Sequence, residues 1–283
     1  MNNNNNEFPK MKSILSILLI FFVLGSTGNI IFSIPMTTTR IHEDNVLAFM
    51  TFNIHFGIDS YGKFNPTEIA KVIASKNVDI VSLQEVTRAS PWNAYADLWE
   101  ILRLEMLKRG YHYYYMDYQG AQSIHNAIFS KYPILETKTF FITPIVRYQR
   151  TLIMAKINVN GTIITVLNTH LTHINSESSF DKRVEQVRSL LDIVNAQISM
   201  PIVLMGDFNS KPEYKEIQLI IQNGFIDTWA QTNPTSSQGY TSTALEPKER
   251  IDYIFFKGLT PLNSFVVSTT VSDHLPVITI TTI

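Results

Sequence analysis

The chain has 283 residues, of which 45% are hydrophobic and 17% are charged, with a formal net charge of −1 and no cysteine. This composition is typical of a globular protein with a sizeable core and argues against a disordered chain. The absence of cysteine excludes disulfides, thiolate catalysis and cysteine-ligated zinc. The near-neutral charge weakens, without excluding, non-specific binding to a polyanion such as DNA.

The N-terminus contains an apolar segment behind a polar, asparagine-rich start. Lys10 and Lys12 precede residues 13–25, which are almost wholly apolar, and small residues follow. This layout is typical of a secretory signal peptide. A second apolar patch at residues 30–34 brings the segment near the length of a membrane-spanning helix, so an uncleaved anchor and a buried N-terminal helix are the alternatives. We expect residues 1–34 to be a signal peptide or membrane anchor, with the rest secreted or membrane-anchored on the non-cytoplasmic side.

The remaining chain alternates strand-like and helix-like segments. Short apolar runs predict strands at residues 46–54, 78–83, 201–205, 251–256, 264–268 and 275–280. Helical spacing predicts a helix that starts at Pro66, and others at residues 98–107, 180–197 and 212–223. No linker or repeat interrupts these elements, which predicts one domain over residues 47–283.

Local signals support several of these boundaries. Asn65 is expected to cap the first helix, with Glu68 returning the bond of a capping box. Gly224 is expected to stop the helix before it. Asn160-Gly161 lies between two alternating runs and predicts a tight hairpin.

Five segments share one form, an apolar strand that ends in polar residues able to bind a metal or a phosphate. They are Phe52-Asn53-Ile54-His55, Leu83-Gln84-Glu85-Val86, Leu167-Asn168-Thr169-His170-Leu171, Met205-Gly206-Asp207-Phe208-Asn209 and Ser272-Asp273-His274-Leu275-Pro276. A sixth segment places Asp252 inside an otherwise apolar strand, where a carboxylate needs a partner.

Each of these residues has an ordinary explanation when taken alone. Glu85 could be a solvated strand end, Asp207 part of a turn, and His170 a core histidine. Taken together, strand ends in a layered sheet converge on one rim. A rim with carboxylates, histidines and asparagines suits an oxygen-ligated cation, donors for phosphate oxygens and an acid/base pair.

The series FNIHFG, DIVSLQEV, NAIFSKYPI, LNTHL, VLMGDFNSKP, RIDYIFF and SDHLPV, in this order, resembles the endonuclease/exonuclease/phosphatase superfamily. Members include DNase I, abasic-site endonucleases, neutral sphingomyelinases and inositol polyphosphate 5-phosphatases. The resemblance runs from about Leu47 to the C-terminus. It implies an α/β (α+β) fold, a four-layer sandwich of two mostly antiparallel β-sheets packed face to face with helices outside. It also implies Mg²⁺-dependent hydrolysis of a phosphodiester or phosphomonoester bond, in which Mn²⁺ could substitute.

The resemblance further implies catalytic roles for five residues. Asp207 would handle a proton and Asn209 would hold an oxygen beside the attacked phosphorus. His170 would donate to the phosphate. His274 would be the general base or a phosphate clamp, oriented by Asp252, and a direct hydrogen bond between these two side chains is predicted.

Metal and substrate contacts are implied in the same way. Glu85 would be the principal Mg²⁺ ligand, with Asn53 and Asp273 at the same end of the site. His55 departs from the family pattern, because some nucleases have an acidic residue there, and it could contact the metal or the leaving group. Asn126 is a candidate substrate-binding residue or, equally, part of a turn at a strand start.

The substrate class is less constrained. The segments most resemble the branch related to the C-terminal domain of GPI-anchor lipid-remodelling proteins, and the N-terminus and neutral charge favour a lipid or small phosphodiester. A secreted or membrane-tethered nuclease and a non-catalytic binding relative are the alternatives. Residues 111–118 (YHYYYMDY) could stack bases or meet a lipid surface, although a strand with one wet face explains them as well. A monomer is expected, held at a membrane only if the N-terminal segment is uncleaved.

Overall fold

A computed structural model of the protein describes residues 46–118, 124–146, 148–173, 177–235 and 239–283. The segment predicted to be a signal peptide or anchor, residues 1–34, lies outside these ranges. Within them, no helix has the length and apolar character that a membrane crossing requires.

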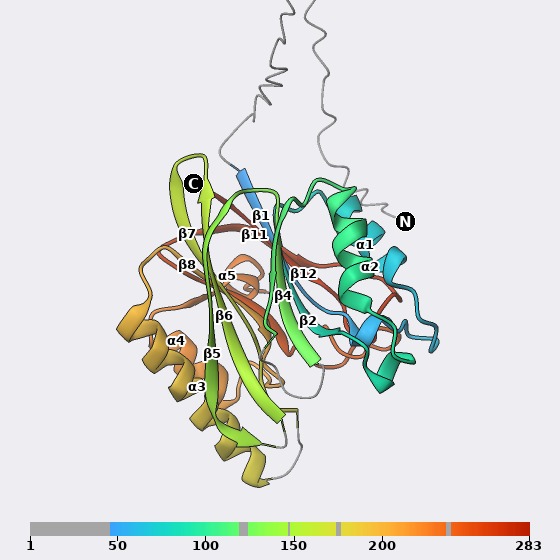
Figure 1. Cartoon of the computed structure of the whole chain (residues 1–283). Coiled ribbons are helices and arrows are strands. Elements are labelled where there is room, and N and C mark those ends of the chain that lie inside the picture. The colour runs from blue at the N-terminus through green and yellow to red at the C-terminus, as the bar shows by residue number, and fades with distance from the viewer. Residues whose placement is uncertain (1–45, 119–123, 147, 174–176, 236–238) are drawn as a thin grey trace, which may run out of the picture. The chain divides into compact units, whose positions relative to one another are not determined.

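Two six-stranded sheets form the centre of the domain (Figure 1). The first has the order β11-β12-β1-β2-β4-β3, with bounds Pro261–Val266, Val277–Thr282, Val46–Asn53, Ile80–Thr87, Ile124–Ser130 and Tyr113–Met116. The second has the order β5-β6-β7-β8-β10-β9, with bounds Ile134–Val146, Tyr148–Val159, Thr162–His170, Ile202–Asp207, Asp252–Lys257 and Ile226–Asp227. Each sheet is antiparallel except for one parallel pair, which is β1 with β2 in the first sheet and β7 with β8 in the second.

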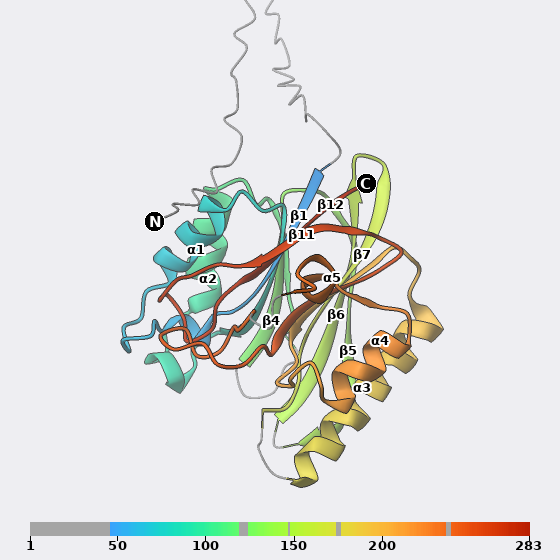
Figure 2. The ribbon, with the colours of Figure 1, turned by 180° about the vertical axis from the view of Figure 1, so that it is seen from behind.

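The helices complete the sandwich (Figures 1 and 2). They are α1 (Pro66–Ser75), α2 (Leu98–Leu107), α3 (Glu177–Gln197), α4 (Lys215–Gln222) and the short α5 (Thr228–Thr232), with two 3₁₀ turns, η1 (His55–Gly57) and η2 (Pro91–Asn93). Figure 1 shows α1 and α2 on one side of the paired sheets and α3 and α4 on the other.

Three apolar clusters account for the layering. One joins α1 and α2 to the outer face of the first sheet, with Ile69 and Leu102 packed against strand residues such as Phe52 and Leu83. A second joins α3 and α4 to the outer face of the second sheet. The third fills the space between the sheets, where Phe49 meets Phe256 edge-on with ring centroids 5.6 Å apart. Because strand side chains alternate between faces, each sheet serves two cores. The predicted four-layer α/β sandwich is therefore confirmed.

Strand direction explains why the polar strand ends meet. β1 and β2 run parallel, as do β7 and β8, so their C-terminal ends lie at the same edge of each sheet. β10 and β12 run antiparallel to β8 and β1, so their first residues start at that same edge. The chain thus brings Asn53, Glu85, His170, Asp207 and Asp252 to one rim.

Two local predictions were wrong. Asn65 precedes α1 as expected, but its side chain makes no capping hydrogen bond, and Glu68 pairs with Lys71 at 2.6 Å instead of closing a capping box. The helix expected from Pro212 begins three residues later, at Lys215, because residues 212–214 form a turn. The Asn160-Gly161 hairpin is confirmed, since both residues have positive φ and Val159 pairs with Thr162.

Candidate active site

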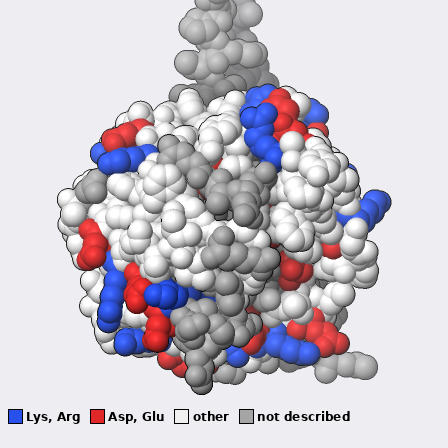
Figure 3. Space-filling view, turned by 60° about the horizontal axis from the view of Figure 1, so that its bottom comes forward, with Lys and Arg blue, Asp and Glu red and all other residues white. Residues whose placement is uncertain are grey.

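The polar strand ends form a buried cluster at one rim of the paired sheets. Figure 3 shows acidic and basic side chains interspersed over the face that it presents. His170 at the end of β7 lies beside Asp207 at the end of β8, and Asp252 at the start of β10 lies opposite Asp207. These three residues are at most 4% exposed. Gly206 allows this approach, because a Cβ there would collide with the carbonyl oxygen of Thr169.

Asp207 is the focus of the cluster. Its Oδ2 accepts a hydrogen bond from Asn53 Nδ2 at 3.0 Å and lies 3.5 Å from His170 Nε2 and 3.9 Å from His274 Nε2. Its Oδ1 accepts from the backbone N–H of Asn209 at 2.9 Å. Nitrogen atoms from both sheets and from the loop before β12 therefore converge on one carboxylate.

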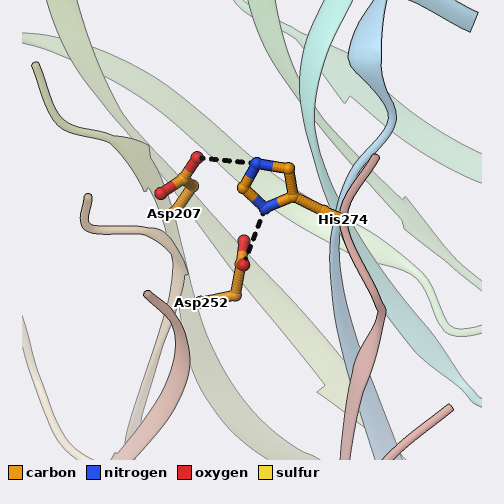
Figure 4. A group of neighbouring side chains, drawn as sticks. All are labelled: Asp207, Asp252 and His274. Carbon is orange, nitrogen blue, oxygen red and sulfur yellow. Dashed lines mark hydrogen bonds and ion pairs between the residues drawn. The ribbon is translucent and has the colours of Figure 1, made fainter. Parts of the chain in front are cut away.

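His274 lies between two carboxylates (Figure 4). Its Nδ1 is 2.8 Å from Asp252 Oδ2, and its Nε2 faces Asp207. This is the hydrogen bond predicted from the sequence, and it provides the partner that a carboxylate in an apolar strand requires. The pairing leaves Nδ1 protonated and directs Nε2 toward the centre of the site.

Burial and neighbouring charges shift the protonation of these groups. Burial raises the pKa of Asp207 to about 7, and the charge of Asp252 adds to this, with His274 opposing. Burial alone would lower the pKa of His274, but the charge and hydrogen bond of Asp252, together with Asp207, raise it well above its usual value. Burial, followed by the positive charge of Arg150, lowers the pKa of His170 well below its usual value. Near neutral pH the site therefore has a protonated His274, a neutral His170 and a titrating Asp207.

Glu85 reaches the site through a distortion of its strand. β2 has a bulge between Leu83 and Val86, and Glu85 adopts a left-handed backbone with φ 59°. Bulges redirect side chains, and strained backbone of this kind is concentrated at functional sites. Glu85 Oε1 accepts from Asn53 Nδ2 at 3.2 Å, so the Asn53 amide bridges Glu85 and Asp207. Burial raises the pKa of Glu85.

The loop before β12 is fixed to the end of β1. Ser272 Oγ donates to the carbonyl oxygen of Asn53 at 2.8 Å and accepts from the backbone N–H of His274 at 3.2 Å. Asp273 lies between these contacts, 3.8 Å from His55 Nδ1, and its charge acts on Glu85. Ser272 thus holds both neighbouring predicted site residues in register with Asn53.

The donor set fits a hard divalent cation. Asp207, Asp252 and His274 each offer one ligand atom, and these atoms lie within 4.8 Å of one another. Among the described residues, Asp252 Oδ1 and His170 Nδ1 are buried without a hydrogen-bond partner, as expected where a further ligand or ion completes a site. Carboxylate oxygen and imidazole without thiolate suit Mg²⁺ or Mn²⁺.

The side chains of two predicted site residues, Asn209 and Asn126, donate hydrogen bonds to residues outside the Asp207 cluster. Asn209 has a left-handed backbone with φ 50°, and its side-chain amide donates to the carbonyl oxygen of Leu171 at 3.0 Å. Asn126 is buried on β4 and its Nδ2 donates to Thr151 Oγ1 at 3.2 Å. Its backbone N–H donates to Asp117 Oδ1 at 2.9 Å.

Several supporting residues were not anticipated from the sequence. Gln84 Nε2 donates to Asn168 Oδ1 at 2.7 Å across the two sheets, and Asn168 Nδ2 donates to two carbonyl oxygens of the first sheet. Arg150 is a buried cation whose charge interacts with Glu85 and Asp207. The sequence does contain a signal for Arg150, because a charged residue near the start of an otherwise apolar strand can indicate a functional role.

Residues 50–274 match the Endonuclease/Exonuclease/phosphatase family. The chain belongs to this family. No protein with curated information matches it by sequence. As a member of the endonuclease/exonuclease/phosphatase family, it is a phosphoester hydrolase, and its buried Asp/His cluster lies at the rim where the polar strand ends were expected to converge.

Solved structures share the fold of this family member. The endonuclease/exonuclease/phosphatase from Beutenbergia cavernae superimposes with a TM-score of 0.73 and 24% identity, covering 84% of this chain and 72% of that one. The mannosyl-6-phosphatase Bt3783 of Bacteroides thetaiotaomicron gives 0.64 and 18%, covering 82% and 98%. D. rerio TDP2, in complex with a single-strand DNA product, gives 0.65 and 18%, covering 85% and 100%.

Proposed function

We propose that the protein is a Mg²⁺-dependent hydrolase of phosphodiester bonds that uses Asp207 as its proton acceptor. The observation that carries this proposal is the convergence of Asn53, His170 and His274 on the buried Asp207 carboxylate. A base is most effective when its pKa lies near the working pH, and that of Asp207 is raised to about 7.

His274 acts as a cation in this proposal. Its hydrogen bond to Asp252 and its raised pKa favour the imidazolium, whose Nε2–H stabilises negative charge that develops on a phosphate oxygen. Neutral His170 supplies a second donor to the phosphate through Nε2. Asn209 holds a phosphate oxygen, as the family pattern implies. Asp207 takes the proton of the attacking water.

Glu85, with Asn53 and Asp273, would hold the metal ion. When bound, Mg²⁺ polarises the phosphoryl group and offsets the negative charge of these carboxylates. The alternative group is Asp207, Asp252 and His274, whose ligand atoms lie within 4.8 Å of one another. We prefer the Glu85 group because the two ring nitrogens of His274 already face Asp252 and Asp207. His55 lies beside Asp273 and completes this end of the site as a contact to the metal or the leaving group.

A lipid headgroup or another small phosphodiester is our preferred substrate. The near-neutral charge of the chain and its apolar N-terminal segment support this choice, as does the resemblance to the GPI-anchor lipid-remodelling branch. A nuclease is the second candidate, supported by the likeness to TDP2, whose structure contains a DNA product. The likeness to a mannosyl-6-phosphatase extends the range to phosphomonoesters.

A substrate panel tests both parts of the proposal. Plasmid DNA, RNA, sphingomyelin, phosphoinositides and bis-p-nitrophenyl phosphate are incubated with the full-length protein in Mg²⁺ or in EDTA, with Asp207→Asn as the control for contaminating hydrolases. Metal-dependent hydrolysis that is lost in Asp207→Asn is expected, with lipid headgroups preferred over DNA. Hydrolysis that survives in Asp207→Asn would show that the assigned base is wrong.

We also propose that residues 1–34 direct the catalytic domain, residues 47–283, into or across a membrane. The support is the basic flank and apolar run at residues 10–25. Such targeting would place the enzyme outside the cytoplasm, where a lipid headgroup of the outer leaflet would be accessible.

A further inference from the structure

A series of stacked rings begins at the metal end of the site. The turn η1 begins at His55, two residues after Asn53, and η2 lies in the loop that follows Glu85 and the end of β2. The ring of Phe56 in η1 stacks on that of Trp92 in η2, with centroids 5.7 Å apart and planes inclined by 17°. The ring of His55 lies 5.5 Å from that of Phe56. We call His55, Phe56 and Trp92 the ring shelf, which leads from a predicted site residue to the surface.

The two turns are held together by Asn93. Its Nδ2 donates to the carbonyl oxygen of Phe56 at 3.3 Å and to Thr87 Oγ1 at 2.8 Å. His55 and Phe56 both have a left-handed backbone, with φ of 43° and 56°, which is unfavourable for residues with a side chain. Such strain persists only where the surroundings enforce it, and it is concentrated at functional sites. The ring shelf is therefore fixed in place beside the site at an energetic cost.

Trp92 leaves much of its ring open to solvent. The residue is 53% exposed although Phe56 covers one face of the indole. Tyr95, three residues later, is also exposed and has a left-handed backbone with φ 63°. Single exposed apolar side chains are common, but this indole is fixed at the end of a ring series that starts in the site. A ligand that covered it would remove apolar surface from water, which is favourable.

The surroundings of the ring shelf indicate which kind of ligand it fits. His55 and Asp273 lie 3.8 Å apart and are both partly exposed, so polar atoms border the rings at the metal end. The cation that precedes η2, Arg88, is already paired with Asp97 through Nε at 3.1 Å and Nη2 at 2.9 Å. A nucleic-acid strand is bound by stacking together with cations that contact its backbone. An apolar face with a polar border and a neutralised cation fits a neutral ring that has a C–H face and hydroxyl groups at its edge.

We propose that Trp92 stacks on a sugar ring in the alcohol part of the phosphoester. The proposal rests on the proposed hydrolysis for the phosphate, and it narrows the substrate to esters that carry such a ring beside that phosphate. The phosphate would lie at Asp207, and the ring would extend past His55 to Trp92. Trp92 takes no part in bond cleavage, so it determines which alcohol is accepted.

Two phosphomonoesters test the proposal without turnover. Glucose 1-phosphate and glycerol 1-phosphate carry the same phosphate, but only the first has a ring. Each is titrated into the full-length protein in Mg²⁺, and Tm and the quenching of tryptophan fluorescence by acrylamide are measured. Glucose 1-phosphate should raise Tm more, because a ligand that binds only the folded state stabilises it in proportion to its affinity. It should also protect the fluorescence, because the sugar covers the exposed Trp92.

Variants separate stacking from a structural role. Trp92→Ala should bind glucose 1-phosphate about tenfold more weakly and glycerol 1-phosphate as the wild type does, while Trp92→Phe should keep most of the difference. Without ligand, Trp92→Ala should unfold close to the wild-type Tm, because the side chain is largely exposed. Phe141→Ala removes an aromatic residue that is 50% exposed on β5 in the other sheet, and this control should bind both ligands as the wild type does.

Three results would overturn the proposal. The first is equal binding of the two phosphomonoesters by the wild type, and the second is an equal loss of both in Trp92→Ala. The third is protection of the fluorescence by adenosine 5′-monophosphate or by phosphatidylcholine vesicles but not by glucose 1-phosphate, which would indicate a nucleobase or a membrane as the ligand of Trp92. If the wild type hydrolyses no phosphoester, the proposed function fails, but the difference between the two phosphomonoesters still decides the role of Trp92.

Discussion

Asp207 and Asp252 lie directly opposite each other on the antiparallel strands β8 and β10, and each is about 1% exposed. Carboxylates in such positions repel each other. His274 lies between them and forms its hydrogen bond with Asp252. Its Nε2 is 3.9 Å from Asp207, so the negative charge of Asp207 is only partly compensated. Burial, with the charge of Asp252 adding to it, raises the pKa of Asp207 to about 7, and a proton becomes exchangeable at the centre of the site near neutral pH.

The first prediction concerns stability. Because the folded-state pKa of Asp207 is raised to about 7, the native state binds this proton more tightly than the unfolded chain does. The associated stability is fully present below about pH 4 and is lost as the pH rises through about 7. In EDTA at pH 8.5, Asp207→Asn should therefore increase the free energy of unfolding by roughly 2–4 kcal/mol, and by less at pH 4.5. Urea denaturation at both pH values measures this, with the exposed Asp192→Asn as a control that should change neither value. A less stable Asp207→Asn at pH 8.5 would contradict the assignment.

The second prediction concerns the pH dependence of kcat/KM. Activity should rise through about pH 7 as Asp207 ionises and fall at higher pH as His274 loses its proton. Asp252→Asn removes the charge that raises the pKa of His274, so the alkaline fall should move to lower pH by about one unit or more. Its effect on kcat should exceed its effect on substrate binding. A pH–rate profile of each enzyme measures this, and an unmoved alkaline limb would exclude the role of His274 as a cation.

The third prediction removes His274 itself. His274→Ala should reduce kcat by about 10²–10³-fold, the range for loss of a donor that stabilises developing negative charge. The fold should be retained, because the side chain contributes to the site and not to an apolar cluster. Steady-state kinetics and circular dichroism test the two parts, and near-normal turnover would rule out a direct role for His274.

The fourth prediction concerns the metal. EDTA should abolish hydrolysis, and Mg²⁺ should restore it. Glu85→Gln should raise the Mg²⁺ concentration required for half-maximal activity by about tenfold or more and leave the fold intact. Asp252→Asn should lower kcat without a comparable change in that requirement. A magnesium titration of the three enzymes distinguishes the two ligand groups, since the reverse pattern would place the ion at Asp207, Asp252 and His274.

The fifth prediction concerns the N-terminus. The full-length protein should enter the secretory or membrane fraction, and deletion of residues 13–25 should leave it in the cytosol. In a host that glycosylates, Asn160-Gly161-Thr162 at the tip of the β6–β7 hairpin should acquire a glycan. Fractionation and glycosidase digestion measure both. Cytosolic retention of the full-length protein would refute the targeting.

The fold could be predicted because the ordered motifs resemble a known family, and the centre of the site could be predicted because its residues also follow local patterns. An apolar strand that ends in Asp207 or His170 is visible in a short window, and a carboxylate inside a strand, as at Asp252, signals its need for a partner. The pairing of Asp252 with His274 was predicted on this basis, together with the order of strands in the family, and the hydrogen bond is present.

The supporting residues could not be predicted because their roles arise from strand pairing. Asp117 and Thr151 meet only when the first sheet packs on the second, and neither residue belongs to a recognisable motif. β5 was missed because its burial is irregular along a long edge strand. The cap predicted at Asn65 is absent because a favourable residue type does not ensure that its side chain turns back toward the helix.

The site residues are far apart in the sequence, and this has a consequence for the newly made chain. The hydrogen bond from Asn53 to Asp207 joins residues 154 positions apart, and His274 follows only near the end of the sequence. Contacts this distant in sequence form late in folding, because long loops must close first. A nascent or unfolded chain therefore has no assembled rim, so hydrolysis of phosphoesters can begin only after both sheets have docked.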